Sequence, residues 1–246
     1  MHPILLLSVA LQIACAVHAV RTGRPMYWLF ILLIGSYVAV AVYLIAEVLP
    51  DMRNSPGTRR AVRGIRDRID PGRQKRLASE RLDAADTVEN RIALADQSLR
   101  SGDFQQAETL YRASLKGLYR TDPDLMLGLA KAQFGLNEFS ESRATLEALI
   151  AANPSFRSQE GHLLYARTVE HTGDIDAALH EYETLAAGYP GEEGRIRYAL
   201  LLKRAGRPEE ANQVFADVLR RTRAAPAYYR REQREWIEVA KAESTL

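Results

Sequence analysis

The chain has 246 residues, of which 47% are hydrophobic, and its formal net charge is +2. This composition excludes a disordered or collagen-like protein, and so small a net charge gives no support for nucleic-acid binding. The single cysteine, Cys15, excludes an internal disulfide and a zinc site built from several cysteines. The averages conceal three segments, residues 1–50, 51–86 and 87–246, whose net charges are +1, +4 and −3.

Residues 1–50 are predicted to form a transmembrane helical hairpin. Residues 3–20 and 26–46 contain no fully charged side chain. As helices they would measure about 27 and 31 Å, close to the ~30 Å hydrocarbon core of a bilayer. Between them lie Gly23 and Pro25, which break helices, and two arginines, which suit a membrane interface.

A cleaved signal peptide is the alternative interpretation of the N-terminus. Ala14, Cys15 and Ala16 could form a small-residue cleavage site, but no positive segment precedes the apolar stretch. The second apolar stretch would in any case still anchor the product. A lipid-modified Cys15 is disfavoured, because Gln12 stands where a branched aliphatic residue is expected.

Residues 51–86 are predicted to be a basic juxtamembrane linker or helix. Nine basic residues lie between positions 51 and 76, against two between the apolar stretches. The positive-inside rule therefore predicts that everything after residue 50 is cytoplasmic. Basic residues near a membrane attract anionic lipid with about 1 kcal/mol each, so the segment also predicts lipid contact. The membrane-proximal candidates are Arg53, Arg59, Arg60, Arg63, Arg66 and Arg68.

Residues 87–246 contain four copies of one pattern. Each copy has a turn residue, a small residue seven positions before it, another five after it, and an aromatic residue or leucine nine after it. The turn residues are Gly102, Asn137, Gly173 and Gly206, which lie 35, 36 and 33 positions apart. A glycine or asparagine ends a helix in a left-handed turn, and small residues let two helices cross closely. The pattern therefore predicts repeated helix–turn–helix units.

This pattern resembles the tetratricopeptide repeat (TPR), and the resemblance covers roughly residues 87–223. It implies an all-α fold, in which the two-helix hairpin is followed by an α-solenoid of four repeats and a C-terminal capping helix. The expected repeats are residues 88–122, 123–158, 159–191 and 192–224, with the capping helix at 226–241. In the first repeat Pro123 comes four residues late, so either its second helix or the following linker is longer. Residues 86–89 predict a capping box that opens the array.

The whole chain resembles a group of bacterial TPR membrane proteins, and its N-terminus is similar to the phospholipase D nuclease N-terminal hairpin. The resemblance places the protein in the bacterial inner membrane, with its TPR domain in the cytoplasm. The phospholipase D reaction needs a His-x-Lys motif, and no histidine here has a lysine two residues on. His162, His171 and His180 are spaced nine apart, which places successive ones on opposite helix faces. We therefore predict no catalytic, cofactor or metal site.

TPR arrays bind proteins or peptides on the surface formed by the first helix of each repeat. Carrying the family's groove positions across gives an apolar floor with basic residues above it, which suits a carboxylate or an acidic peptide. The chaperone-tail carboxylate clamp is not reproduced, since Ile92, Asp96 and Gly128 replace its lysine and asparagine residues. The candidate groove residues are Ile92, Asp96, Leu127, Lys131, Phe134, Leu163, Arg167, Glu170, Arg197, Leu200 and Lys203.

Together these features predict a membrane-anchored, cytoplasm-facing, non-catalytic scaffold that binds a protein partner. The alternative is an accessory factor that recruits a lipid enzyme through anionic phospholipid. A repeat domain on the opposite, periplasmic side of the membrane is a third interpretation.

Overall fold

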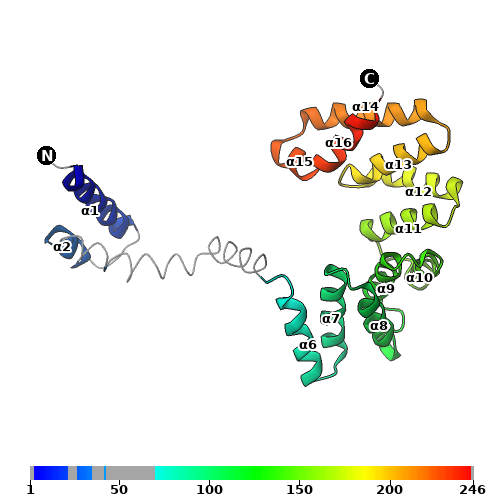
Figure 1. Cartoon of the computed structure of the whole chain (residues 1–246), viewed down its shortest axis with the longest axis horizontal. Helices are drawn as coiled ribbons and strands as arrows, with labels where there is room; N and C mark the ends of the chain where they lie inside the picture. The colour runs from blue at the N-terminus through cyan, green and yellow to red at the C-terminus, as the bar shows by residue number, and fades with distance from the viewer. Residues whose placement is uncertain (1–2, 22–26, 35–41, 43–69, 245–246) are drawn as a thin grey trace. The chain divides into compact units, whose positions relative to one another are not determined.

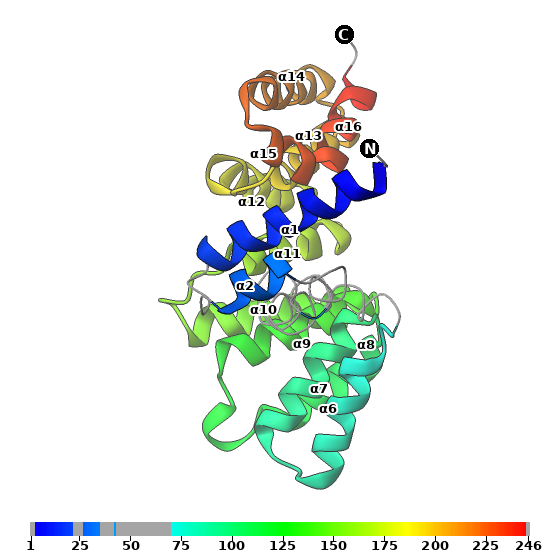
Figure 2. The same cartoon turned by 90° about the vertical axis from the view of Figure 1, so that its left-hand side faces the viewer.

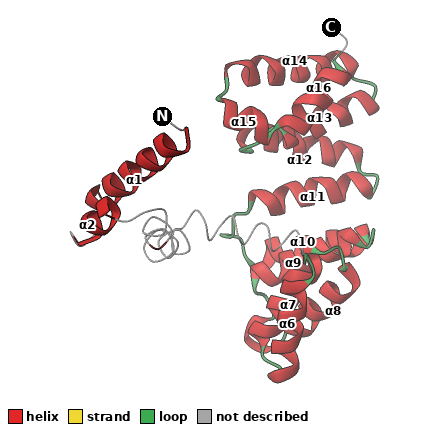
Figure 3. Ribbon diagram, turned by 60° about the vertical axis from the view of Figure 1, so that its left-hand side comes forward, coloured by secondary structure: helices red, strands yellow, loops and turns green. Residues whose placement is uncertain are grey.

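The structure of the protein, a computed structural model, describes residues 3–21, 27–34, 42 and 70–244. Every regular element in these ranges is a helix, so the predicted all-α fold is confirmed for this part of the chain (Figure 3). The chain divides into two units, Met1–Arg73 and Gln74–Leu246.

The first unit contains the helices α1 (Pro3–Arg21) and α2 (Tyr27–Ile34), which contact each other. Cys15, Ala19 and Trp28 are buried in this unit. Among the described residues, no helix combines the length and the apolar character needed to cross a membrane. Most of the second predicted span lies outside the described residues, and so do the basic candidates Arg53, Arg59, Arg60, Arg63, Arg66 and Arg68.

The second unit begins with α6 (Arg73–Ala84), which forms the C-terminal part of the predicted juxtamembrane segment. Near its start, Lys75 Nζ lies 2.5 Å from Asp103 Oδ2. Just beyond its end, Asn90 Nδ2 donates a hydrogen bond to the Ala85 carbonyl at 2.8 Å. These contacts fix α6 beside α7, as Figure 2 shows.

The next helices stack in chain order from α7 to α14, and α16 packs against α14 and α13 (Figure 1). Each repeat consists of a first helix, called helix A, and a second helix, called helix B. The A helices are α7 (Val88–Arg100), α9 (Pro123–Gly135), α11 (Gln159–His171) and α13 (Glu193–Arg204). The B helices are α8 (Phe104–Ser114), α10 (Phe139–Ala152), α12 (Ile175–Gly188) and α14 (Pro208–Ala224).

The predicted turn and packing positions are confirmed. Gly102, Asn137, Gly173 and Gly206 have φ values of 78°, 61°, 88° and 77°, the left-handed conformation that ends a helix with least strain in glycine or asparagine. The small residues on both helices have no exposed surface: Ala95, Ala130, Ala166 and Ala199 on the A helices, and Ala107, Ser142, Ala178 and Ala211 on the B helices. The core therefore runs between the helices of each repeat.

Buried larger side chains fill the space between successive repeats. They are Tyr111, Leu146, Tyr182 and Phe215, the positions that lie nine residues after each turn. Burying one such apolar side chain stabilises a fold by about 1.5–3 kcal/mol. These side chains continue the core from one repeat to the next.

The array opens one residue later than the sequence predicts. The N-cap of α7 is Thr87, whose Oγ1 accepts a hydrogen bond from the Asn90 N–H at 3.2 Å. Asp86 instead pairs with Arg91 at 2.5 Å. In the first repeat, α8 ends at Ser114 and a short 3₁₀ turn, Gly117–Tyr119, precedes α9. The extra residues of this repeat therefore lengthen the linker and not the second helix.

The C-terminal cap also differs from the single helix predicted over 226–241. It consists of α15 (Ala227–Glu232) and α16 (Arg234–Glu243), separated at Gln233. The break places Gln233 Oε1 2.8 Å from the Glu192 N–H, so its side chain caps the start of α13. A long-range hydrogen bond therefore decides where the helix is interrupted.

The same cap supplies a hydrogen-bond donor to a buried carboxylate. Glu192 is 1% exposed, and its Oε1 accepts a hydrogen bond from the Tyr229 hydroxyl at 2.8 Å. Its Oε2 is buried without a hydrogen-bond partner. Burial and the bond to the Glu192 carboxylate raise the pKa of Tyr229 to about 12. Tyr229 thus joins the cap to the fourth repeat.

We predict that Gly128→Ala destabilises the protein by about 1–3 kcal/mol, because an added methyl group overpacks a filled site. A Cβ at this position would lie 2.5 Å from Cζ of the buried Tyr111 ring. Gly188→Ala is the control, since Gly188 is also helical, as the last residue of α12, but has nothing within 4 Å of its Cβ position. Urea unfolding of the full chain in detergent measures the free energy of unfolding of both variants. Equal effects of the two substitutions would contradict the close packing of Tyr111 on Gly128.

We predict that Tyr229→Phe destabilises the protein by about 1–3 kcal/mol, because it leaves a buried carboxylate without a hydrogen-bond donor. The neighbouring Tyr228 is 65% exposed, so Tyr228→Phe should leave stability unchanged. The thermal unfolding midpoints of the two variants test this directly. A Tyr229→Phe variant as stable as the wild type would mean that the cap does not depend on this bond.

Candidate binding groove

The A helices of the first three repeats form the wall of a cavity of about 1180 Å³. The loop before α11 and the start of α13 complete it. Six of the residues that the sequence predicts for the groove line this cavity: Asp96, Leu127, Lys131, Phe134, Leu163 and Arg167. The structure therefore brings these six together.

The other predicted groove residues have different surroundings. Ile92 packs on the core of the first repeat, and Leu200 packs on the C-terminal core. Arg197 pairs with Glu193 at 2.8 Å and lies over the Trp236 ring at 5.1 Å. Lys203 pairs with Glu243 at 2.9 Å. These four residues and Glu170 lie outside the set that lines the cavity.

Buried tyrosines hold two of the acidic positions. The Tyr111 hydroxyl donates to Asp96 Oδ1 at 2.5 Å, and the Tyr182 hydroxyl donates to Glu170 Oε2 at 2.6 Å. Burial raises the pKa of both tyrosines, and the bonded carboxylates raise it further. Glu170 also pairs with Arg204. Asp96 and Glu170 therefore join helix A to helix B as well as facing the A-helix surface.

An aromatic cluster forms part of the cavity floor. Phe134 contacts Phe139 edge-on with 5.2 Å between ring centroids, and the Arg167 guanidinium lies 4.6 Å above the Phe134 ring. His171 stacks on Phe139 at 4.2 Å. His162 instead contacts Glu181 Oε2 at 2.8 Å. Among the described residues, no group of histidines, cysteines and carboxylates is arranged to hold a metal ion.

The basic residues of the cavity differ in their partners. Lys131 Nζ lies 2.7 Å from Glu160 Oε2. Arg157 donates to the carbonyls of Pro154 and Phe156. Arg167 has no hydrogen bond or ion pair to any described residue, and its Nε is buried. Burial and the nearby positive charge of Arg197 lower the pKa of Arg167. The carboxylates of Glu193 and Glu170 act on this pKa in the opposite direction. The site therefore contains one half-buried cation that forms no ion pair with a described carboxylate.

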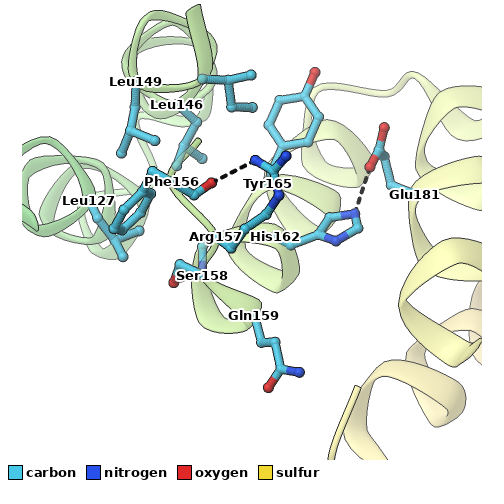
Figure 4. A pocket seen from close by; sticks show the side chains of 12 residues that line it. Leu127, Leu146, Leu149, Phe156, Arg157, Ser158, Gln159, His162, Tyr165 and Glu181 are labelled. Carbon is cyan, nitrogen blue, oxygen red and sulfur yellow. Dashed lines mark hydrogen bonds and ion pairs between the residues drawn. The ribbon is translucent and has the colours of Figure 1, made fainter. Parts of the chain in front are cut away.

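The sequence analysis missed the contribution of the loop between the second and third repeats. Phe156, Arg157 and Ser158 line the large cavity and also a second one of about 670 Å³, shown in Figure 4. Leu146, Leu149 and Tyr165 give this second cavity an apolar wall. An aromatic residue two positions after the helix-ending Pro154 is the signal that could have indicated a loop packed against the core through Phe156.

Comparison with known proteins supports a TPR protein. Residues 98–168 match the tetratricopeptide repeat family profile. Residues 41 to the end of MamA from Desulfovibrio magneticus RS-1 are 16% identical, with a TM-score of 0.58, over 69% of this chain and 95% of that one. TTC0263, a thermophilic TPR protein of Thermus thermophilus, is 19% identical, with a TM-score of 0.53, over 68% and 89%. No curated protein shows significant sequence similarity. At these identities the similarity establishes a TPR-like solenoid fold.

Proposed function

We propose that this protein is a membrane-anchored, cytoplasm-facing scaffold that binds a protein partner in the groove and catalyses no reaction itself. The observation that carries the proposal is the cavity of about 1180 Å³ along the A helices. It exceeds the ~300–1,000 Å³ of ordinary small-molecule sites, and its length along three repeats suits an extended or helical segment of another protein.

The composition of the cavity supports a peptide ligand. Leu127, Leu163 and Phe134 supply apolar and aromatic contact area, while charged residues surround them. Interfaces commonly combine an apolar centre with a polar rim, and the buried anchors there contribute most of the binding energy. The TPR-like fold of the array supports the same role.

The membrane anchor is supported by the sequence. The two uncharged stretches at 3–20 and 26–46 and the basic residues that follow them motivate an inner-membrane location with a cytoplasmic TPR domain. We include in this proposal the resemblance of the N-terminus to the phospholipase D nuclease N-terminal hairpin, which is a membrane segment. The second candidate function is an accessory factor for a lipid enzyme, which the concentration of basic residues at 51–76 favours.

Photo-crosslinking in intact cells tests the scaffold role. A photoreactive amino acid at Lys131, within the cavity, should capture a discrete protein band. The same amino acid at Arg220, exposed on α14, is the matched control and should capture much less. Equal capture at both positions would contradict a groove-bound partner. Retention of anionic phospholipid through purification, with no band at Lys131, would favour the second candidate.

Thiol labelling tests the anchor and its orientation. In a full chain carrying Cys15→Ser and Tyr228→Cys, the new thiol replaces a 65% exposed side chain. A membrane-impermeant maleimide should label it only after the inner membrane is permeabilised, and the protein should stay in the membrane fraction after alkaline carbonate extraction. Labelling in intact spheroplasts would place the TPR domain outside the cytoplasm, and release by carbonate would refute the anchor.

A further inference from the structure

Arg167 differs from the other cations on the A-helix surface, because it is half-buried and forms no ion pair, whereas each of the others is paired with a carboxylate or exposed. Lys131, Arg197 and Lys203 pair with Glu160, Glu193 and Glu243 at 2.7, 2.8 and 2.9 Å. Arg100 lines the cavity and is exposed, so water can solvate it. Arg167 is half-buried and has no ion pair to a described carboxylate.

The carboxylates on the same surface of the A helices are already engaged. Glu170 accepts from the Tyr182 hydroxyl and pairs with Arg204. Glu193 pairs with Arg197, and Glu160 pairs with Lys131. Rearranging the groove to pair Arg167 would therefore break another ion pair or leave a tyrosine hydroxyl without its acceptor. An incoming anion avoids this cost.

The Phe134 ring also helps to hold the guanidinium in place. The central carbon of the Arg167 guanidinium lies over this ring, 4.6 Å from its centroid, and such a contact favours the cation. A guanidinium only donates hydrogen bonds, and its N–H groups lie in one plane. A carboxylate can accept two parallel bonds from it, the arrangement in which arginine–carboxylate contacts are strongest.

The remaining charges limit what kind of anionic ligand fits. Four cations, Arg100, Lys131, Arg157 and Arg167, line the cavity together with four acidic residues, Asp96, Asp124, Glu160 and Glu193. A lining with no net charge gives a polyanion no general attraction. Apolar and aromatic residues line the same cavity as Arg167, among them Leu127, Phe134, Leu163 and Tyr189.

We infer that Arg167 anchors a carboxylate-binding subsite, and that the partner segment carries one aspartate or glutamate beside apolar side chains. This inference rests on the proposed function and names the chemistry of its partner. A stretch of many acidic residues is not expected, because a lining with no net charge gives it no general attraction.

Selection from a phage-displayed random dodecapeptide library, with the full chain in detergent as bait, tests the inference. Enriched peptides should carry a single acidic residue flanked by apolar ones. Fluorescence anisotropy then measures the affinity of the protein for the best peptide and for its amide counterpart, in which Asn or Gln replaces the acidic residue. We expect Arg167→Met to lower the affinity for the acidic peptide about tenfold to a hundredfold. The Arg167→Met protein should bind the acidic peptide and its amide counterpart with equal affinity.

Arg157→Met is the control, because Arg157 lines the same cavity but bonds only to carbonyls of its own loop. It should change affinity by no more than about twofold, as expected for an exposed charge. Arg167→Met should also leave the thermal midpoint unchanged or higher, since it removes an uncompensated charge and keeps an apolar stem on Phe134. A large fall in the midpoint would assign Arg167 a structural role and overturn the inference.

The outcomes separate the two proposals. Enriched peptides without an acidic residue, or with equal affinity for wild type and Arg167→Met, refute the subsite while the groove remains a peptide site. Enrichment of polyacidic peptides refutes the single-carboxylate ligand. No enrichment together with a crosslinked band at Lys131 counts against the subsite alone, whereas the absence of both refutes the scaffold role as well.

Discussion

The close approach of helix A to helix B within each repeat is the constraint on which the rest of the array depends. Eight alanine or serine positions have no exposed surface, and a larger side chain at any of them would separate the two axes. Gly128 extends the same requirement to the junction between repeats, because its missing side chain admits the Tyr111 ring. Once these distances are set, every A helix presents its outward side chains to a common surface.

This packing also determines the chemistry of the groove. Tyr111 and Tyr182 lie on B helices, and their rings are buried in the core. Their hydroxyls donate hydrogen bonds to carboxylates of the A helices, Asp96 and Glu170. The two hydroxyls therefore fix the positions of these carboxylates, which keep their negative charge. A core residue of one helix thus decides where a charge on the opposite helix is held.

The sequence predicted what depends on local spacing. Turn residues, small crossing residues and the side chains between repeats recur at fixed offsets, so the helix pairs and much of the cavity wall follow from them. It did not predict the break at Gln233 or the loop residue Phe156, because each depends on contacts with distant segments. The Gln233 side chain reaches Glu192, 41 positions away, and no local pattern encodes that bond. Neither could spacing separate Ile92 and Leu200, which pack into the core, from the true lining residues.

The same difference between local and long-range information explains why the sequence could not distinguish Arg167 from the other basic residues of the groove. By position it is equivalent to Lys131, since both follow the crossing alanine of their A helix. Their difference lies in the partners: Glu160 reaches Lys131 from the next A helix, whereas Glu193, in the corresponding place one repeat later, is held by Arg197. Partly burying a charge without an ion pair lowers stability. The ion pairs of the neighbouring repeats therefore leave Arg167 as the half-buried cation to which we assign the carboxylate of a partner.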